Sequence, residues 1–214
     1  MGVQSSFGFT LGRMEKGRLN KITDVPGVRV GHVTRHEGGI NTGVTAILPH
    51  TGDMFHDKCP AASHVINGFG KSIGLVQVNE LGTIETPLLL TNTLSVGTAA
   101  TALVKYMLER NEDIGRDTGT VNPMVFECND GHLNDIRGLH VTEQNALDAL
   151  ANAADDFEEG AVGAGSGMSC YSLKGGIGSA SRVFELYGNK YTVGALLLTN
   201  FGTLRDLTIG GERV

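Results

Sequence analysis

Cysteine is scarce in this sequence, and the residues present form no recognisable framework. Cys59, Cys128 and Cys170 are odd in number and far apart, and none belongs to a Cys-x-x-Cys pair. Disulfide-stabilised secreted domains and structural zinc sites both require more regularly spaced cysteines. We therefore expect neither feature, and we expect a reducing, cytoplasmic environment.

Long apolar runs and basic runs are also missing. No apolar stretch approaches the roughly 18 residues that a membrane-spanning helix needs, and residues 1–7 lack the cationic and apolar regions of a signal peptide. Acidic residues outnumber basic residues by 23 to 17, which gives a formal net charge of −6. This charge balance, without a basic cluster, argues against binding to nucleic acids or anionic membranes.

Glycine is in excess, at 31 of 214 residues, which is about twice its average share. The glycines follow no three-residue period, so a collagen helix is excluded. Hydrophobic residues make up 40% and charged residues 19%, as in ordinary folded proteins. Without a linker, repeat or low-complexity tract, residues 1–214 are expected to form a single domain with residues 1–20 as an extended N-terminal arm.

The hydrophobic pattern predicts about seven strands and two or three helices. Strands are predicted at residues 28–33, 43–48, 62–67, 86–91, 121–126, 181–187 and 191–198, the last two as a hairpin around Gly188-Asn189. Helices are predicted to begin at Ser72, Ser95 and Thr142. Because strands and helices do not strictly alternate, the order favours a mixed-sheet α+β fold or layered sandwich over a doubly wound parallel sheet.

Three glycine-rich segments resemble parts of nucleotide-binding loops. Residues 68–72 end in Gly70-Lys71-Ser72, but Val65 occupies the position of the first glycine of a phosphate loop. Residues 163–168 lack a strong strand before them and a helix after them, and residues 174–182 repeat the glycine theme. We expect a simple turn between a strand and a helix at 68–72, and close backbone packing at the other two segments.

The histidines do not predict a metal site. His50, His56 and Cys59 share one loop, but their spacing fits no usual zinc template. His32 and His64 lie in strand-like stretches, where we expect ordinary core or edge residues with hydrogen-bond partners. No metal or cofactor is therefore expected.

The densest polar cluster, residues 127–135, directly follows the strand predicted at 121–126. Glu127 at a strand end is either a partner for a substrate ammonium group or part of a solvated loop. Cys128 and His132 are a conceivable thiol–imidazole pair, although the sequence gives no distance between them. Asn200 follows the apolar strand 191–198, where its carboxamide is either a neutral oxyanion donor or part of a strand-ending turn. No complete set of nucleophile, base and orienting residue is recognisable within the chain.

Eight motifs, taken in their order along residues 10–214, together resemble one known family. They are Asp24-Val25-Pro26-Gly27-Val28 within residues 19–32, Asn41-Thr42-Gly43-Val44-Thr45 with Leu48-Pro49, Val65-Ile66-Asn67-Gly68, Leu90-Thr91-Asn92-Thr93, Glu127 with Leu133-Asn134-Asp135, Glu159-Gly160-Ala161-Val162-Gly163, Lys174-Gly175-Gly176-Ile177-Gly178, and Tyr191-Thr192-Val193-Gly194. The sequence is similar to the DmpA-like aminopeptidases, which include the L-aminopeptidase D-esterase/D-amidases and the β-peptidyl aminopeptidases.

The resemblance implies a self-processing serine peptidase with a four-layer αββα sandwich like that of N-terminal-nucleophile hydrolases, but with different connectivity. In the family, one precursor cleaves itself into an α chain and a β chain, and the β chain begins with the nucleophilic serine. Members assemble as homotetramers of αβ units. This sequence ends at Val214, before the position of that serine, so the resemblance implies an α subunit or its ordered part, with the β subunit as its partner.

The resemblance also assigns residues and a reaction. Asn200 matches the position whose carboxamide helps bind the oxyanion, and Glu127 matches the position whose carboxylate holds the free amino group of the substrate. His132 and Asn134 are expected in the adjoining substrate-binding wall. The implied activity is hydrolysis of N-terminal amide bonds in short peptides, amino-acid amides or esters. The alternatives are an acyltransferase of a related self-cleaving fold and a non-enzymatic nucleotide- or metabolite-binding module that uses Lys71.

Overall fold

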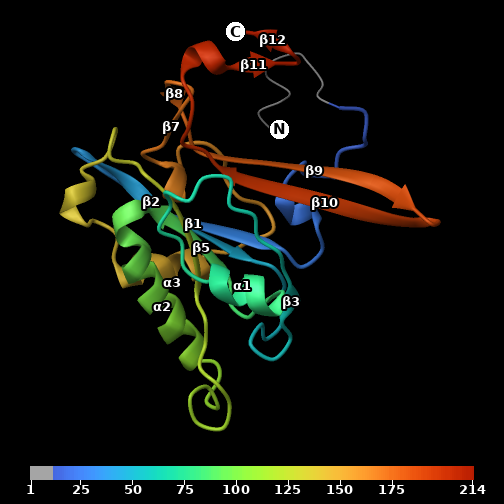
Figure 1. Cartoon of the computed structure of the whole chain (residues 1–214), viewed down its shortest axis with the longest axis vertical. Coiled ribbons are helices and arrows are strands. Elements are labelled where there is room, and N and C mark those ends of the chain that lie inside the picture. The colour runs from blue at the N-terminus through green and yellow to red at the C-terminus, as the bar shows by residue number, and fades with distance from the viewer. Residues whose placement is uncertain (1–11) are drawn as a thin grey trace.

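A four-stranded sheet forms the centre of the computed structural model, which describes residues 12–214 (Figure 1). Its strands, in the spatial order β1-β2-β5-β6, are β1 (Arg29–Glu37), β2 (Ile40–Leu48), β5 (Leu88–Asn92) and β6 (Met124–Cys128). Neighbouring strands are antiparallel except for β5 and β6, which are parallel and are joined by a helical crossover. Four of the predicted strands are thereby confirmed, with shifted ends.

The hairpin of β9 (Ile177–Leu186) and β10 (Asn189–Leu198) forms a second β layer, drawn as a long ribbon that projects past the central sheet in Figure 1. Leu186 pairs with Asn189, so the turn residues are Tyr187 and Gly188, one position earlier than predicted. Both have positive φ, 51° and 77°. A two-residue turn with this conformation matches the right-handed twist of the strands on either side.

Three α-helices lie within residues 12–214: α1 (Leu75–Leu81), α2 (Val96–Leu108) and α3 (Glu143–Ala151). The predicted start of α3 is confirmed, because Thr142 and Asn145 form a reciprocal capping box. The predicted start of α2 is also confirmed, because Ser95 is its N-cap residue, but the Ser95 side chain makes no capping hydrogen bond. The Asn92 side chain instead accepts hydrogen bonds from the N–H groups of Leu94 and Ser95.

Short elements complete the described part of the chain. They are β3 (Cys59–Pro60) paired with β4 (Thr83–Ile84), β7 (Ser169–Cys170) with β8 (Leu173–Lys174), β11 (Thr208–Ile209) with β12 (Glu212–Arg213), and 3-10 turns at Ile22–Asp24, Thr93–Ser95, Ile136–Gly138, Gly163–Gly165 and Leu204–Asp206. Most of the predicted N-terminal arm, residues 1–11, lies outside the described residues. The remainder contacts β9, where Gly17 donates its N–H to the Ser181 hydroxyl over 3.1 Å.

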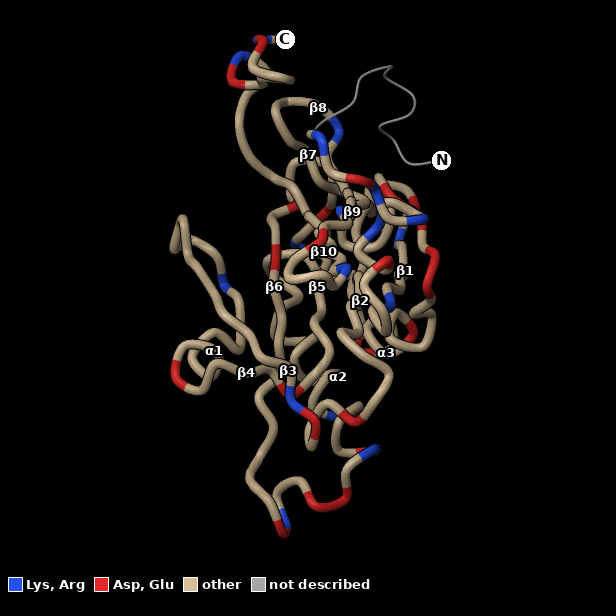
Figure 2. Tube along the Cα trace, turned by 90° about the vertical axis from the view of Figure 1, so that its right-hand side faces the viewer, with Lys and Arg blue, Asp and Glu red and all other residues tan. Residues whose placement is uncertain are grey.

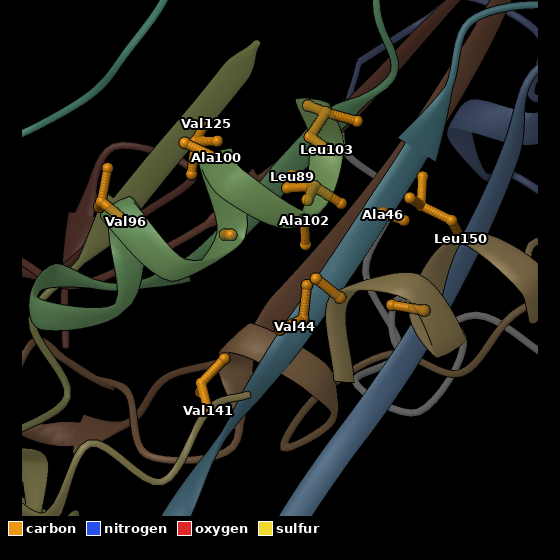
Figure 3. Packing of buried hydrophobic residues seen from close by; sticks show 13 residues of the cluster. Val44, Ala46, Leu89, Val96, Ala100, Ala102, Leu103, Val125, Val141 and Leu150 are labelled. Atoms are coloured by element: carbon orange, nitrogen blue, oxygen red, sulfur yellow. The ribbon is translucent and has the colours of Figure 1, made fainter. Parts of the chain in front are cut away.

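The alternation of side chains along the central strands places a hydrophobic core on each face of the sheet. Val44 and Leu89 pack against α2 and α3 on one face, as Figure 3 shows. Leu90, Phe126 and Ile47 face the other way, toward β9 and β10. The molecule therefore has a helical layer, the sheet β1-β2-β5-β6 and the layer β9-β10 in that order, consistent with three layers of the predicted sandwich.

Most charged residues lie on the outer segments of this layered structure, although Glu85 and Asp130 are buried. The chain trace in Figure 2 carries acidic and basic residues on the peripheral segments, whereas β2 and β5 contain none. Within residues 12–214, no helix has both the length and the apolar character needed to cross a membrane.

The strand predicted at residues 62–67 is wrong. This stretch is an exposed loop, in which the side chains of Val65 and Ile66 are 54% and 94% exposed and His64 belongs to no strand. The helix predicted to begin at Ser72 begins instead after Gly74, which has φ 101°. Glycine tolerates this left-handed conformation, which few other residues adopt.

Glycine allows the backbone of α3 to lie directly against β1. A Cβ atom added to Gly31 would lie 2.2 Å from the carbonyl oxygen of Ala149 and 2.6 Å from the amide nitrogen of Ala153. Both are backbone atoms, which cannot move without displacing α3. The same closeness occurs at Gly43 and Gly163, where the glycine-rich turn 163–165 packs on β2. This confirms the close backbone packing predicted for residues 163–168.

We expect Gly31→Ala to lower the free energy of unfolding of the full-length protein by about 1–3 kcal/mol, because the added methyl group must displace α3. Gly97→Ala on α2 is the matched control, since a Cβ atom there meets nothing within 4 Å; it should stabilise the helix by about 0.5–1 kcal/mol. Denaturant unfolding of both variants measures the difference. Equal stabilities would contradict the packing argument.

His56 links the loop after β2 to the loop after α2. Its Nδ1 lies 2.6 Å from Oδ2 of Asp53, and its Nε2 lies 3.0 Å from Oδ2 of Asp113. These hydrogen bonds, to Asp53 first and then to Asp113, raise the pKa of His56 above its usual value of 6.5. A protonated imidazole donates from both nitrogens, so both bonds form fully only in the charged state.

A histidine whose pKa is raised by folding stabilises the folded state below its unfolded pKa, and this contribution is lost as the pH rises through the folded pKa. The loss of stability caused by His56→Gln should therefore be larger at about pH 6 than at about pH 8.5. Denaturant unfolding at the two pH values measures it, with His64→Gln in the exposed loop as the control. A loss independent of pH would rule out the charged link.

Candidate functional site

The ends of β6 and β10 lie in contact, and each carries one of the predicted site residues, Glu127 and Asn200. Glu127 is the fourth residue of β6, and Asn200 follows the end of β10. The Asn200 Nδ2 donates to the carbonyl of Asn129 over 2.5 Å, and the Cys128 thiol donates to the carbonyl of Leu198 over 3.5 Å. Hydrogen bonds thus join the two β layers on both sides of this junction.

The Asn200 side chain is oriented by this contact. A carboxamide nitrogen carries two hydrogens, and the carbonyl of Asn129 takes one of them. No acceptor among residues 12–214 takes the second, which is left for another group. Since Asn200 lines a cavity, its amide is placed to donate to a group bound there.

That cavity has a volume of about 620 Å³ and is formed by three segments of the chain. They are His132 with Leu133, the β7–β8 hairpin, and residues 200–202. The structure therefore places His132 and Asn200, two of the predicted site residues, in the wall of one cavity. Its size is within the range of small-molecule sites.

The β7–β8 hairpin is a part of the cavity wall that the sequence did not predict. Its turn residues, Tyr171 and Ser172, both have positive φ, 53° and 61°, so residues 169–172 are not simply extended. The Tyr171 N–H donates to the carbonyl of Phe201 over 2.7 Å, and the two rings meet edge to face with centroids 4.9 Å apart. The unusual turn is thus held against the segment that follows Asn200.

Lys174 has a structural environment at the edge of the same cavity. Its ammonium group donates to the carbonyls of Gly165, Met168 and Gly175 over 2.8–3.0 Å. Burial lowers the pKa of Lys174 from its usual value. This lysine therefore fastens the two glycine-rich segments to each other, in agreement with the prediction that they pack closely.

Glu127 does not line the cavity but lies two residues before Asn129, which orients Asn200. Its carboxylate accepts hydrogen bonds from the Lys71 backbone N–H, over 3.0 Å, and from the Thr93 hydroxyl. Sequence reasoning did not find these two donors, because both come from segments far from residue 127 along the chain.

Asn134 is set apart from the cavity. It is buried, its Oδ1 accepts from the N–H of Asn41 over 2.9 Å, and its Nδ2 donates to Asp130 over 3.0 Å. These bonds tie the loop after β6 to the start of β2. The expected contact between Asn134 and a substrate stays a prediction.

Two other sequence hypotheses lose support. Burial is the largest cause that raises the pKa of Cys128 to about 11, so this thiol is protonated at neutral pH and unsuited to be a nucleophile. The Lys71 ammonium lies 3.8 Å from the centroid of the Phe69 ring and donates to the Phe69 carbonyl. Residues 68–72 therefore do not form the phosphate-binding turn that their sequence suggested, nor do they follow a strand.

Residues 20–214 match the sequence model described as peptidase family S58. The β-peptidyl aminopeptidase BapA of Sphingosinicella microcystinivorans is 40% identical to this chain over 208 residues, which cover 92% of this chain and 51% of that protein. The BapA protein of Sphingosinicella xenopeptidilytica is 37% identical over the same length and coverage. The chain thus spans about half the length of these curated relatives.

Solved structures match nearly all of the chain, over 94–99% of its length. The PH0078 protein of Pyrococcus horikoshii OT3 is 57% identical with a TM-score of 0.96, over 99% of this chain and 62% of that one. A β-aminopeptidase of a Burkholderia species is 45% identical with a TM-score of 0.90, over 98% and 60%. The L-aminopeptidase D-Ala-esterase/amidase of Ochrobactrum anthropi, described as a new variant among the Ntn-hydrolase fold, is 38% identical with a TM-score of 0.84, over 94% and 58%. The fold of this chain is therefore that Ntn-hydrolase variant, and the predicted fold class is confirmed.

Proposed function

We propose, from the premise that this chain belongs to peptidase family S58, that it is the α part of a serine aminopeptidase. The proposed enzyme hydrolyses N-terminal amide bonds of short peptides, amino-acid amides or esters. Its nucleophile is a serine at the start of a second chain, which is cut from the same precursor. The described relatives include β-peptidyl aminopeptidases and an L-aminopeptidase.

The observation that carries this proposal is the fixed carboxamide of Asn200 in the cavity wall. The carbonyl of Asn129 holds one amide hydrogen, so the other is preorganised to donate before any substrate binds. Donors held in this way stabilise the negative charge that develops on a carbonyl oxygen during acyl transfer. A neutral donor does this without a competing charge in the resting site.

The proposed reaction follows the chemistry of acyl transfer. The serine hydroxyl of the second chain loses its proton to a base on that chain and attacks the carbonyl carbon, and Asn200 donates to the resulting oxyanion. Collapse of the tetrahedral intermediate expels the amine, which takes up a proton, and leaves an acyl-enzyme ester. Water then hydrolyses that ester and regenerates the serine.

The carboxylate of Glu127 accounts for the requirement for a free amino terminus. A carboxylate and an ammonium group form a charge-assisted hydrogen bond, which is about twice as strong as a neutral one. A substrate whose amino group is blocked cannot form this pair. Glu127 is therefore proposed to select the first residue of a peptide.

The outward face of β10 has the character of a binding surface for the second chain. Tyr191, Val193 and Leu197 alternate along this strand with exposed fractions of 46%, 57% and 53%, and β10 pairs only with β9 among the described residues. An apolar face on an edge strand favours coverage by a further β element. We propose that the remainder of the precursor covers it.

Asn200→Ala in the full-length precursor should lower kcat by about 10²–10³ on an alanine p-nitroanilide, the usual cost of losing one oxyanion donor. Asn189→Ala, at the opposite end of β10, is the matched control and should retain activity. Hydrolysis kinetics are measured on protein whose second chain is confirmed by intact mass to begin with serine. An unchanged kcat, or a protein without such a chain, would refute the proposal, and an added amine acceptor separates hydrolysis from acyl transfer.

Glu127→Gln should reduce kcat/KM for alanine p-nitroanilide about 10- to 100-fold, since it removes the charge of the ammonium partner. The N-acetylated substrate, which has no ammonium group, should be cleaved at the same low rate by both proteins. Glu185→Gln on the exposed part of β9 serves as the control. A proportional loss on both substrates would argue against recognition of the amino group by Glu127.

A further inference from the structure

We propose that Thr93 is a positioning residue which, together with the backbone N–H of Lys71, orients the Glu127 carboxylate toward the ammonium group of the substrate. This inference rests on the function proposed above. It identifies the groups that would hold the Glu127 side chain in the orientation needed to bind an ammonium group.

Each oxygen of the Glu127 carboxylate accepts one hydrogen bond from a different segment. Lys71 N–H donates to Oε1 over 3.0 Å, and the Thr93 hydroxyl donates to Oε2. An ionised carboxylate offers about four acceptor sites. The two donors therefore fix the plane of the carboxylate while each oxygen keeps a site for a ligand.

No cation neutralises Glu127 within residues 12–214, and both of its donors are uncharged. The nearest basic residue along this loop, Lys71, directs its ammonium group to the ring and carbonyl of Phe69 instead. A half-buried carboxylate whose two donors are both uncharged is suited to pair with a cationic group. The arrangement suits a primary ammonium group, which has three donors.

Thr93 is itself held in a fixed position by the residue before it. Asn92 is 2% exposed, donates to the Thr42 hydroxyl over 2.8 Å, and accepts from the N–H groups of Leu94 and Ser95 over 3.1 Å. In the β5–β6 register Asn92 is opposite Cys128, the residue after Glu127. Thr93 therefore directly follows the paired strand β5. A side chain held by such rigid elements has a precisely defined position.

Loss of the Thr93 hydroxyl would leave Oε2 without its donor and the carboxylate free to rotate. Substrates that bind through an ammonium group would then lose affinity, whereas substrates without one would react as before. A purely structural role for Thr93 would affect both kinds of substrate equally. This difference makes the inference testable in the assembled enzyme.

The test compares p-nitrophenyl esters of alanine and of propionic acid, which differ by the amino group. Thr93→Val, which keeps the side-chain shape, should lower kcat/KM for the alanine ester about tenfold or more, mainly through KM. Thr93→Val should hydrolyse the propionic ester at the wild-type rate. Thr93→Ser should have a kcat/KM for the alanine ester close to that of the wild-type enzyme. Thr101→Val on the exposed side of α2 is the matched control, since within residues 12–214 its hydroxyl bonds only to the Gly97 carbonyl.

Equal losses on both esters in Thr93→Val and in the smaller Thr93→Ala would overturn the role of Thr93, as would failure of Thr93→Ser to restore the preference. Thr93→Ala also covers the case in which valine prevents assembly. A wild-type enzyme that cleaves neither ester would overturn the proposed function itself, so the two failures are distinguishable.

Discussion

The hydrogen bond from Asn200 to the carbonyl of Asn129 is the contact on which the site depends. It joins the ends of two strands from different β layers, and the thiol of Cys128 makes a second connection beside it. The position of Asn200 relative to Glu127 is therefore set by packing between layers and not by one local turn. A shift of β9–β10 against the central sheet would change the orientation of the carboxamide and its distance from the carboxylate together.

That packing between layers depends in turn on the excess of glycine. The turn at 163–165 lies between the sheets, where the Ala164 N–H donates to the Thr45 hydroxyl and a side chain at Gly163 would collide with β2. The Lys174 ammonium group donates to the carbonyl of Gly165 in this turn and to that of Gly175, the residue after β8. The glycine-rich segments thus allow the central sheet and the β9–β10 layer to pack closely. Their resemblance to nucleotide-binding loops reflects only a shared need for backbone without side chains.

The sequence predicted those features that depend on local pattern. Six strands and the helices α2 and α3 were predicted because alternation and 3.6-residue spacing persist over enough residues to identify them. The strand at 62–67 was predicted from Val65 and Ile66, yet no neighbouring strand pairs with them, and an apolar stretch alone does not provide a partner. The β7–β8 turn has no sequence signature, because Tyr171 and Ser172 are not residues that usually adopt positive φ.

The site was less predictable than the fold, for a physical reason. From spacing alone, Glu127 and Asn200 were each compatible with an ordinary loop, and only the resemblance to a family favoured their functional roles. The contacts that position these two side chains join residue 127 to residues 71 and 93, and residue 129 to residue 200. Contacts of such large sequence separation leave no periodic trace, so a single sequence does not reveal them.

The uncovered strand β10 has a consequence for biosynthesis. An edge strand that pairs only with β9 among residues 12–214, and that has tyrosine, valine and leucine on its outer face, is a template for pairing with another nascent chain. A covering element supplied on the same polypeptide has an effective concentration on the order of millimolar, far above that of a competitor diffusing in the cell. Synthesis as one precursor, cut only after folding, would let that element pair with β10 before any competing chain. It would thereby prevent the exposed β9–β10 hairpin from nucleating aggregates.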